Sequence, residues 1–328
     1  MKIAIQGLGR MGMQIARKLA ESGEHTVIAH NRSHEPIDEA AAFGATKAYE
    51  KADVIREFGS DQVVIWIMLP DNIVDAQIDE WLTLVPKGSI LIDGGNSDFR
   101  ITKQQNKRVS DAGSYLLDIG VSGGVWGYQN GFPLMCGGDS EQAFAVIEPV
   151  LKTLVQPGGM YNHFGPSGAG HFVKMVHNAI EYGMMESLAE GFRMLHDGPY
   201  KNLNLAEAAD LWQHHSVITS WLTELSRDAF RENPELEGIS GYVVESGEAR
   251  WTLEAAKDLG IALPSIQAAF DVRLASQKGE VNFATKTVAA QRNKFGGHNL
   301  NGEGAEAGVR EQIAHEKPEN PNPETESN

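Results

Sequence analysis

A glycine-rich segment near the start of the chain constrains its fold more than any other feature. Gly7-Leu8-Gly9-Arg10-Met11-Gly12 follows the apolar run Lys2–Gln6 directly and precedes a helical pattern. In a dinucleotide-binding βαβ unit, the first glycine makes a tight turn, the second admits a pyrophosphate and the third lets helix and strand pack closely. The N-terminus of the helix offers free N–H groups to the phosphates. We therefore predict a cofactor site made of Gly7, Leu8, Gly9, Arg10, Met11 and Gly12.

Short apolar runs alternate with helical patterns through the first half of the chain. The runs that predict buried strands are Lys2–Gln6 and residues 26–29, 62–68, 89–92 and 115–119. Such alternation is typical of a doubly wound parallel sheet. From about Ser167 onward the pattern is almost wholly helical. We expect an α/β N-terminal Rossmann-type doubly wound domain over residues 1–166 and an all-α C-terminal domain over residues 167–298.

Composition and charge exclude several classes of protein. The 328 residues carry a formal net charge of −16, which argues against nucleic acid as a partner because phosphate binding needs a basic surface. No apolar run reaches the ~18 residues of a membrane-spanning helix, and no signal peptide precedes the first strand, so we expect a cytoplasmic protein. Cys136 is the single cysteine, which excludes an internal disulfide framework. No metal is expected, because no cluster has metal-ligand spacing.

The end of the chain differs in composition from the rest. Residues 299–328 are rich in Glu, Pro, Asn and Gly and contain few large apolar side chains. Such a segment buries too little surface to offset the entropy lost on ordering. We predict a disordered acidic tail there.

The turn after the second predicted strand indicates which nucleotide is bound. A carboxylate at this position would hydrogen-bond the ribose 2′-hydroxyl and favour NAD. Here the turn contains Asn31, Arg32 and Ser33 and no carboxylate. Because a guanidinium presents a fork of donors to a phosphate, we expect NADP, with NAD as the less favoured cofactor.

A polar stripe runs along the helix predicted around residues 170–182. Lys174, His177, Asn178, Glu181 and Tyr182 fall on one helical face, whereas the intervening residues are largely apolar. Lys174 and Glu181 are about 10 Å apart along such a helix, so both could contact one small substrate. A buried lysine loses its proton readily and can act as a base near neutral pH. An internal polar network between helices is the alternative that the stripe alone leaves open.

Several motifs in one order resemble the decarboxylating 6-phosphogluconate dehydrogenases. Beyond the first glycine segment, the resemblance rests on four stretches: Ile92-Asp93-Gly94-Gly95-Asn96-Ser97, Gly120-Val121-Ser122-Gly123-Gly124, the helix with Lys174-Met175-Val176-His177-Asn178, and Arg292-Asn293-Lys294-Phe295-Gly296-Gly297-His298. These matches extend from residue 1 to residue 298. The resemblance implies the oxidation and decarboxylation of 6-phosphogluconate in the pentose phosphate pathway, with reduction of NADP.

The resemblance also implies a role for each matching residue. Lys174 would be the general base of the oxidation and then an acid toward the ketone, and Glu181 would protonate the enediol carbon. Arg292 and His298 would reach in from a neighbouring subunit, which implies a homodimer or homotetramer with shared active sites. The implied substrate-binding residues are Asn96, Ser122, Gly123, Gly124, His177, Asn178, Tyr182, Arg273, Arg292 and His298; Asn96 is implied in cofactor binding as well.

The chain departs from the long members of that family in two respects. Long members have a much larger helical domain with an internal duplication, so this chain resembles the short form. Ser246 stands where long members place a phosphate-binding lysine. Two alternative functions stay open: another β-hydroxyacid dehydrogenase, such as one that acts on 3-hydroxyisobutyrate, and a regulator that binds NADPH without turnover.

Overall fold

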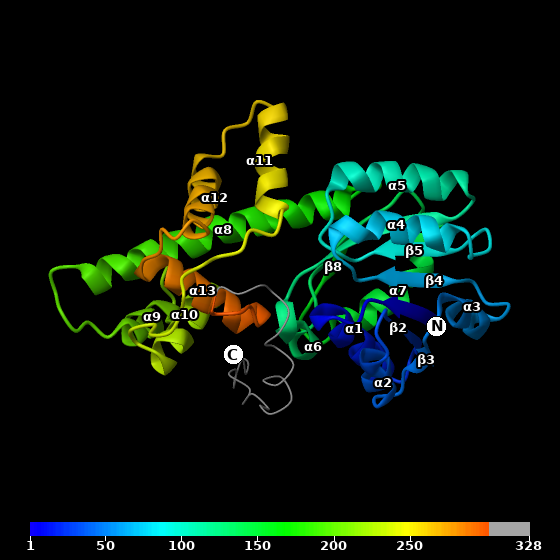
Figure 1. The fold of residues 1–328 in the computed structure, drawn as a ribbon, viewed down its shortest axis with the longest axis horizontal. Coiled ribbons are helices and arrows are strands. Elements are labelled where there is room, and N and C mark those ends of the chain that lie inside the picture. The colour runs from blue at the N-terminus through cyan, green and yellow to red at the C-terminus, as the bar shows by residue number, and fades with distance from the viewer. Residues whose placement is uncertain (302–328) are drawn as a thin grey trace, which may run out of the picture. The chain divides into compact units, whose positions relative to one another are not determined.

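The computed structural model describes residues 1–301, which divide into two compact units (Figure 1). The first unit contains Met1–Met184 and Glu245–Asp271. The second contains Met185–Val244 and the described chain from Val272 onward. Two helices, α8 (Ala169–Asp197) and α12 (Pro264–Ser276), begin in the first unit and end in the second. The domain boundary expected near Ser167 stays a prediction.

One eight-stranded sheet forms the centre of the first unit, in the order β3-β2-β1-β4-β5-β6-β7-β8. Its strands are β1 (Lys2–Gln6), β2 (Thr26–His30), β3 (Thr46–Ala48), β4 (Val64–Ile67), β5 (Ile90–Asp93), β6 (Tyr115–Val121), β7 (Leu134–Gly137) and β8 (Tyr161–His163). The five predicted runs correspond to β1, β2, β4, β5 and β6. The fold class is confirmed: a Rossmann-type sheet is followed by a helical C-terminal part.

Three strands were not predicted from the sequence, and one of them runs antiparallel to its neighbour. β3 and β8 are three residues long, too short to show a two-residue periodicity. β7 pairs antiparallel with β6, with Val121 opposite Leu134. The sheet is therefore mostly parallel, and its one antiparallel pair forms because the connection between residues 121 and 134 returns beside β6 without a full crossover helix.

Helices cover both faces of the sheet because successive strand residues point to opposite sides. Ile3 and Ile5 of β1 pack on one face with buried residues of α1, α2 and α7, whereas Ala4 packs on the other with residues of α3, α4 and α5. The helices are α1 (Arg10–Glu21), α2 (Glu35–Ala41), α3 (Lys51–Phe58), α4 (Asp71–Leu82), α5 (Phe99–Asp111), α6 (Gly127–Asn130) and α7 (Glu141–Val155), with the 3-10 helix η1 (Gly124–Trp126). This two-sided covering is the doubly wound arrangement.

The described elements that follow α8 are all helices: α9 (Leu205–Gln213), α10 (Trp221–Glu232), α11 (Glu248–Asp258), α12 and α13 (Phe283–Gly296). In the second unit, Phe192, Phe230 and Phe283 belong to one buried core. Leu300 packs against that core, and its carbonyl accepts a hydrogen bond from the Ser240 N–H. The start of the expected tail is therefore docked; the rest of it lies outside the described residues.

His214 and His215 do not form a helical pair. α9 ends at Gln213, His214 follows as its C-cap residue, and His215 has a φ of 62°. The chain leaves the helix through this left-handed residue. Both side chains are exposed.

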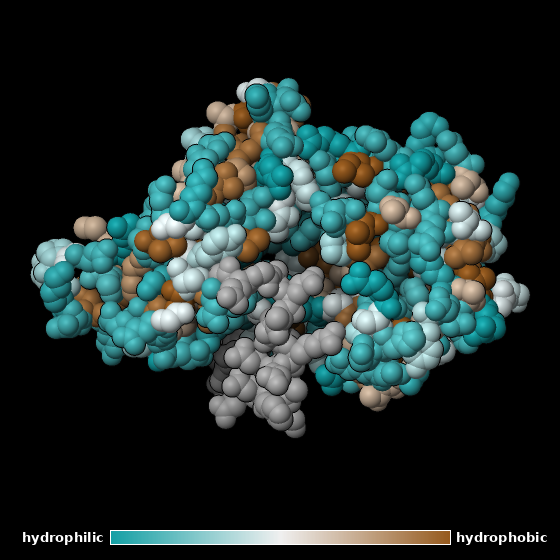
Figure 2. Space-filling view, viewed as in Figure 1, coloured by the Kyte–Doolittle hydropathy of each residue, from teal (hydrophilic) through white to brown (hydrophobic). Residues whose placement is uncertain are grey.

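The visible surface is largely hydrophilic, with hydrophobic residues in separate groups (Figure 2). Such a surface agrees with the formal net charge of −16. None of the helices in residues 1–301 is both long and apolar enough to cross a bilayer.

Candidate active site

The first glycine segment forms an open cradle at the N-terminus of α1. Gly7 has a φ of 93°, and a Cβ atom at Gly12 would lie 1.9 Å from the Gly7 carbonyl oxygen, so neither position accepts a side chain. By contrast, a Cβ atom at Gly9 would meet no atom within 4 Å. Gly9 is also the N-cap of α1 and provides no side-chain cap. The open space and the free helix N-terminus fit a dinucleotide phosphate.

The turn after β2 adjoins this cradle. The Asn31 Oδ1 accepts a hydrogen bond from the Leu8 N–H at 3.1 Å, and the Asn31 Nδ2 donates to the Ser33 Oγ at 3.1 Å. Asn31 therefore holds the turn against the glycine segment. Arg32 is exposed and forms no hydrogen bond or ion pair with another described residue. Its guanidinium is available to an anionic ligand.

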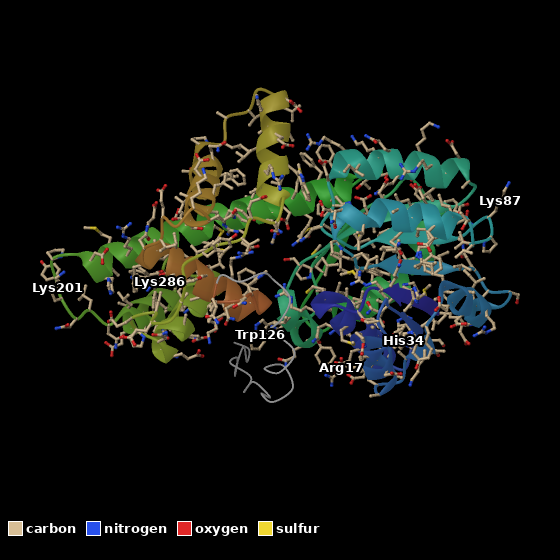
Figure 3. The ribbon with its side chains drawn as sticks, in the orientation of Figure 1. Arg17, His34, Lys87, Trp126, Lys201 and Lys286 are labelled. Atoms are coloured by element: carbon tan, nitrogen blue, oxygen red, sulfur yellow. The ribbon has the colours of Figure 1, made fainter. Side chains whose placement is uncertain are left out.

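A second loop, between β6 and β7, is attached to the same helix α1. The Lys18 Nζ donates to the Tyr128 carbonyl at 2.6 Å, and the Arg17 guanidinium lies 4.8 Å from the centre of the Tyr128 ring. Figure 3 labels Arg17 together with Trp126 of η1. In this loop Gly123 and Gly124 have φ values of 103° and 54°, a region that strongly favours glycine.

Asn96 lies at the same edge of the sheet as the two loops. It follows β5, whose neighbours β4 and β6 run parallel to it. The carboxyl ends of parallel strands meet at one edge, where ligands bind in folds of this type. Asn96 is exposed there. The structure thus gathers the segments after β1, β2, β5 and β6 at one edge.

Helix α8 is anchored on the sheet by a buried carboxylate. Asp118 of β6 is fully buried and accepts hydrogen bonds from the Gly168 N–H at 2.8 Å and the His171 N–H at 2.9 Å. A carboxylate at a helix N-terminus satisfies free N–H groups and complements the helix dipole. A Cβ atom at Gly170 would lie 2.5 Å from the Asp118 carbonyl oxygen, so the helix sits directly on β6.

Lys174 follows this anchor by one helical turn and is buried against Gly120 of β6. A Cβ atom at Gly120 would lie 2.4 Å from the Lys174 Cβ and 2.7 Å from its Cγ. The lysine is 7% exposed and makes no hydrogen bond with a described residue. Burial lowers the pKa of Lys174, while the nearby charges of Glu181 and Glu248 oppose that shift. This environment suits an amine that must lose and regain a proton.

Four side chains form a hydrogen-bonded row beside Lys174. The Ser122 Oγ lies 3.4 Å from the His177 Nε2, and the His177 Nδ1 lies 2.8 Å from the Asn178 Oδ1. The Asn178 Nδ2 donates to the Glu248 Oε1 at 2.7 Å. Burial lowers the pKa of His177, and the charge of Lys174 lowers it further. The row joins the loop after β6, helix α8 and helix α11.

Tyr182 makes a separate contact with the start of α11. Its hydroxyl lies 3.2 Å from the Ser246 Oγ and accepts a hydrogen bond from the Ser246 N–H at 3.3 Å. Glu248, two residues further on, was not among the predicted site residues. The sequence offered one signal: Glu248 lies two residues after Ser246, the position where the resemblance implied a departure from the long family members.

Three predicted site residues belong to the second unit. Arg273 is 2% exposed, and its Nη2 lies 3.7 Å from the Met185 Sδ. Arg292 is buried in α13, and the His298 carbonyl accepts a hydrogen bond from the Asn293 Nδ2 at 2.8 Å. The contacts named here lie within the second unit. Their part in substrate binding stays a prediction.

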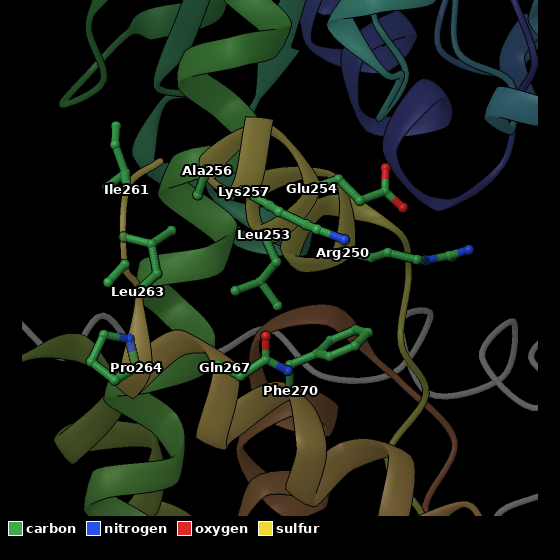
Figure 4. A pocket seen from close by; sticks show the side chains of 11 residues that line it. Arg250, Leu253, Glu254, Ala256, Lys257, Ile261, Leu263, Pro264, Gln267 and Phe270 are labelled. Carbon is green, nitrogen blue, oxygen red and sulfur yellow. The ribbon is translucent and has the colours of Figure 1, made fainter. Parts of the chain in front are cut away.

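A pocket of about 590 Å³ lies between α11 and the start of α12 (Figure 4). Its lining is largely apolar, with Leu253, Leu263 and Phe270, and includes the charged residues Arg250, Glu254 and Lys257. None of the predicted site residues lines it.

Cys136 also lies outside the row of polar side chains; it is buried, and burial together with the charge of Asp118 raises its thiol pKa to about 12.

The fold and the site define an oxidoreductase with a Rossmann-type NAD(P)-binding part and a helical part. Residues 2–164 match the NAD binding domain of 6-phosphogluconate dehydrogenase, and residues 170–315 match the C-terminal domain of 6-phosphogluconate dehydrogenase. The chain is 38% identical over 302 residues to YqeC of Bacillus subtilis, a candidate 6-phosphogluconate dehydrogenase, and covers 98% of it. The chain belongs to the 6-phosphogluconate dehydrogenase family, as the sequence motifs had indicated.

One further relative and two solved structures are also similar to this chain. The NAD(+)-dependent decarboxylating 6-phosphogluconate dehydrogenase of Haloferax volcanii is 34% identical, with 92% of this chain and 98% of that protein covered. The Plasmodium falciparum 6-phosphogluconate dehydrogenase superimposes with a TM-score of 0.75 at 27% identity, over 85% of this chain but 63% of that chain. The 3-hydroxyisobutyrate dehydrogenase of Mycobacterium tuberculosis shares the fold, with a TM-score of 0.66 at 22% identity over 88% of this chain and 97% of that chain.

Proposed function

We propose that the chain catalyses the oxidative decarboxylation of 6-phosphogluconate to ribulose 5-phosphate and carbon dioxide, with NADP as the hydride acceptor. The observation that carries the proposal is the burial of the Lys174 amine against Gly120, which lowers the pKa of that amine. Lys174 lies on the same helix as Glu181. A base and a proton donor on one helix are what this sequence of steps requires. The names of the two curated relatives support the same substrate.

The cofactor site fits NADP. The open space above Gly9 and the uncapped N-terminus of α1 would hold the pyrophosphate. Arg32 would face the 2′-phosphate with Asn31 and Ser33 beside it, and Leu8, Arg10, Met11 and Asn96 would complete the contacts. Bound NADP supplies the hydride acceptor next to the substrate hydroxyl. The Haloferax relative is named for NAD(+), so the choice of nucleotide is a central part of the test.

The proton transfers can be assigned to two side chains. The Lys174 Nζ takes the proton of the hydroxyl β to the carboxylate while the hydride leaves that carbon, which gives a β-keto acid. The bond to the carboxylate then breaks, carbon dioxide leaves, and the lysine ammonium gives its proton to the ketone oxygen, which forms an enediol. Glu181 would give a proton to the enediol carbon, and Lys174 would accept the enediol hydroxyl proton; proton exchange with solvent would restore both groups. A cationic lysine can thus stabilise the developing charge.

The remaining predicted residues would hold the substrate. Ser122, Gly123, Gly124, His177 and Asn178 would contact its carboxylate and hydroxyls, and Tyr182 and Arg273 its phosphate. Arg292 and His298 would come from a neighbouring subunit, which requires a homodimer or homotetramer. The two family matches end at residue 164 and begin at residue 170, which supports domains at 1–166 and 167–298.

One observation favours a second candidate, a β-hydroxyacid dehydrogenase for an unphosphorylated acid such as 3-hydroxyisobutyrate. At the start of α11 the chain has Ser246 in contact with Tyr182, and the buried carboxylate of Glu248 lies two residues away. A carboxylate so close to the expected phosphate position is unfavourable for a dianionic group. Binding of the 6-phosphogluconate phosphate would therefore depend on Arg273, Arg292 and His298.

A side-by-side assay separates the candidates. Reduced cofactor and released carbon dioxide are measured with 6-phosphogluconate, gluconate and 3-hydroxyisobutyrate, each with NADP and with NAD. The proposal predicts equimolar reduced NADP and carbon dioxide from 6-phosphogluconate and far slower turnover of the other acids. Oxidation of 3-hydroxyisobutyrate without carbon dioxide would establish the second candidate. Tight NADPH binding with no turnover of any acid would instead indicate a regulator.

A further inference from the structure

The hydrogen-bonded row beside Lys174 ends in a residue with no assigned role, Glu248. It is the first residue of α11 and is 2% exposed. Its Oε1 accepts the hydrogen bond from Asn178, whereas its Oε2 is buried and has no hydrogen-bond partner among the described residues. An incompletely paired buried carboxylate costs stability. Such a group is expected where its charge contributes to function.

The chemistry of a carboxylate fixes the direction of every bond in the row. A carboxylate only accepts hydrogen bonds, so the amide of Asn178 must turn its NH2 group toward Glu248. The Asn178 oxygen then faces the His177 Nδ1 at 2.8 Å and needs a proton on that nitrogen. In neutral histidine the other nitrogen is then an acceptor. The His177 Nε2 therefore presents its lone pair to the Ser122 Oγ, 3.4 Å away.

We propose that Glu248 is a positioning residue, which through Asn178 holds His177 as the Nδ1–H tautomer with Nε2 as the acceptor that faces Ser122 and the bound acid. The inference rests on the proposed function for its kinetic consequence but not for the tautomer itself. A histidine whose Nε2 is an acceptor can receive a hydrogen bond from a substrate hydroxyl. With the other tautomer, the same nitrogen would donate and would bind the carboxylate instead.

The charge of Glu248 also affects the pKa of Lys174. The titratable groups around Lys174 are Glu181 and the neutral His177 on α8 and Glu248 on α11. The two carboxylates raise the pKa of Lys174 against the effect of burial. Loss of the charge on Glu248 should lower that pKa further, so the base should become unprotonated at a lower pH.

The test uses the full-length enzyme with Glu248→Gln, which preserves size, and Glu248→Leu, which removes the acceptor altogether. Glu254→Gln is the matched control, because Glu254 is an exposed carboxylate on the same helix, paired with Arg100. Histidine-selective 15N NMR of the resting enzyme reports the tautomer, and a His177→Gln spectrum assigns the signal. We expect the Nδ1–H tautomer in the wild type and Glu254→Gln, and a mixture or the Nε2–H form in both Glu248 variants.

Kinetics provide the second measurement. We expect the Glu248 variants to lose about 10-fold or more in kcat/KM for 6-phosphogluconate, with unchanged NADPH binding and with the acidic limb of the pH profile at lower pH. An unaltered tautomer in both variants overturns the proposal, even if the wild type turns over 6-phosphogluconate. A tautomer change in an enzyme that does not use 6-phosphogluconate would retain the positioning role and refute the proposed substrate.

Discussion

Gly120 of β6 touches Lys174 of α8 so closely that a methyl group at residue 120 would lie 2.4 Å from the lysine Cβ. Atoms this close must separate, and interiors are too densely packed to absorb the change without cost. Strand β6 and helix α8 are in contact at the point where the Lys174 side chain branches from the helix backbone. The position of that base therefore depends on the absence of a side chain on the strand.

Gly120→Ala should displace Lys174 and reduce kcat/KM by about 10- to 100-fold, since small misplacements of a reacting group cost about that much. Steady-state kinetics with NADPH titrations check this. Gly191→Ala is the control, because Gly191 is exposed on the same helix with no atom within 4 Å of an added Cβ. That control should keep full activity and gain up to about 1 kcal/mol in stability. Full activity in Gly120→Ala would contradict the proposed packing constraint on the base.

Lys174→Met should abolish the oxidation while NADPH binding stays nearly unchanged, because the side chain contacts Gly120 and not the glycine cradle. General-base catalysis contributes about 10²–10⁴-fold, so the loss in kcat should be at least 100-fold. Lys174→Arg retains the positive charge but cannot act as a base, and should be equally inactive. Rates near the wild-type value in either variant would remove Lys174 from the mechanism.

Arg32→Asp should shift the cofactor preference from NADP toward NAD. Charge-assisted hydrogen bonds to a phosphate are worth roughly 1.5–3 kcal/mol, so the ratio of kcat/KM for NADP over NAD should fall at least about tenfold. Lys87→Asp makes the same change in net charge at an exposed residue that precedes β5 (Figure 3) and should leave the ratio unchanged. A ratio that does not move in Arg32→Asp places the 2′-phosphate elsewhere.

Glu186 should make the protein less stable as the pH rises. Burial raises the pKa of Glu186 from 4.5 to about 7, with a further contribution from Glu190 and opposition from Arg273. Between these two pH values the unfolded chain is ionised while the folded chain keeps its proton. The contribution of Glu186 to the free energy of unfolding is therefore fully present below pH 4.5 and is lost as the pH rises through about 7.

Glu186→Gln should remove this slope, which is at most about 1.4 kcal/mol per pH unit, and should raise stability at pH 8. Urea unfolding at a series of pH values measures both effects. Glu190→Gln, an exposed neighbour on the same helix, should retain most of the slope. If wild type and Glu186→Gln have the same pH dependence, Glu186 is ionised in the folded protein.

The sequence alone determined the fold class and the five central strands, and it predicted which residues form the site. It could do so because these features are local: a glycine segment between a strand and a helix, and polar residues at helical spacing. Only the tertiary structure showed that Asp118 anchors α8, that Gly120 admits Lys174 and that Glu248 reaches Asn178. Glu248 and Asn178 are 70 residues apart in sequence. No local pattern encodes such a contact, because it depends on how distant helices and strands pack.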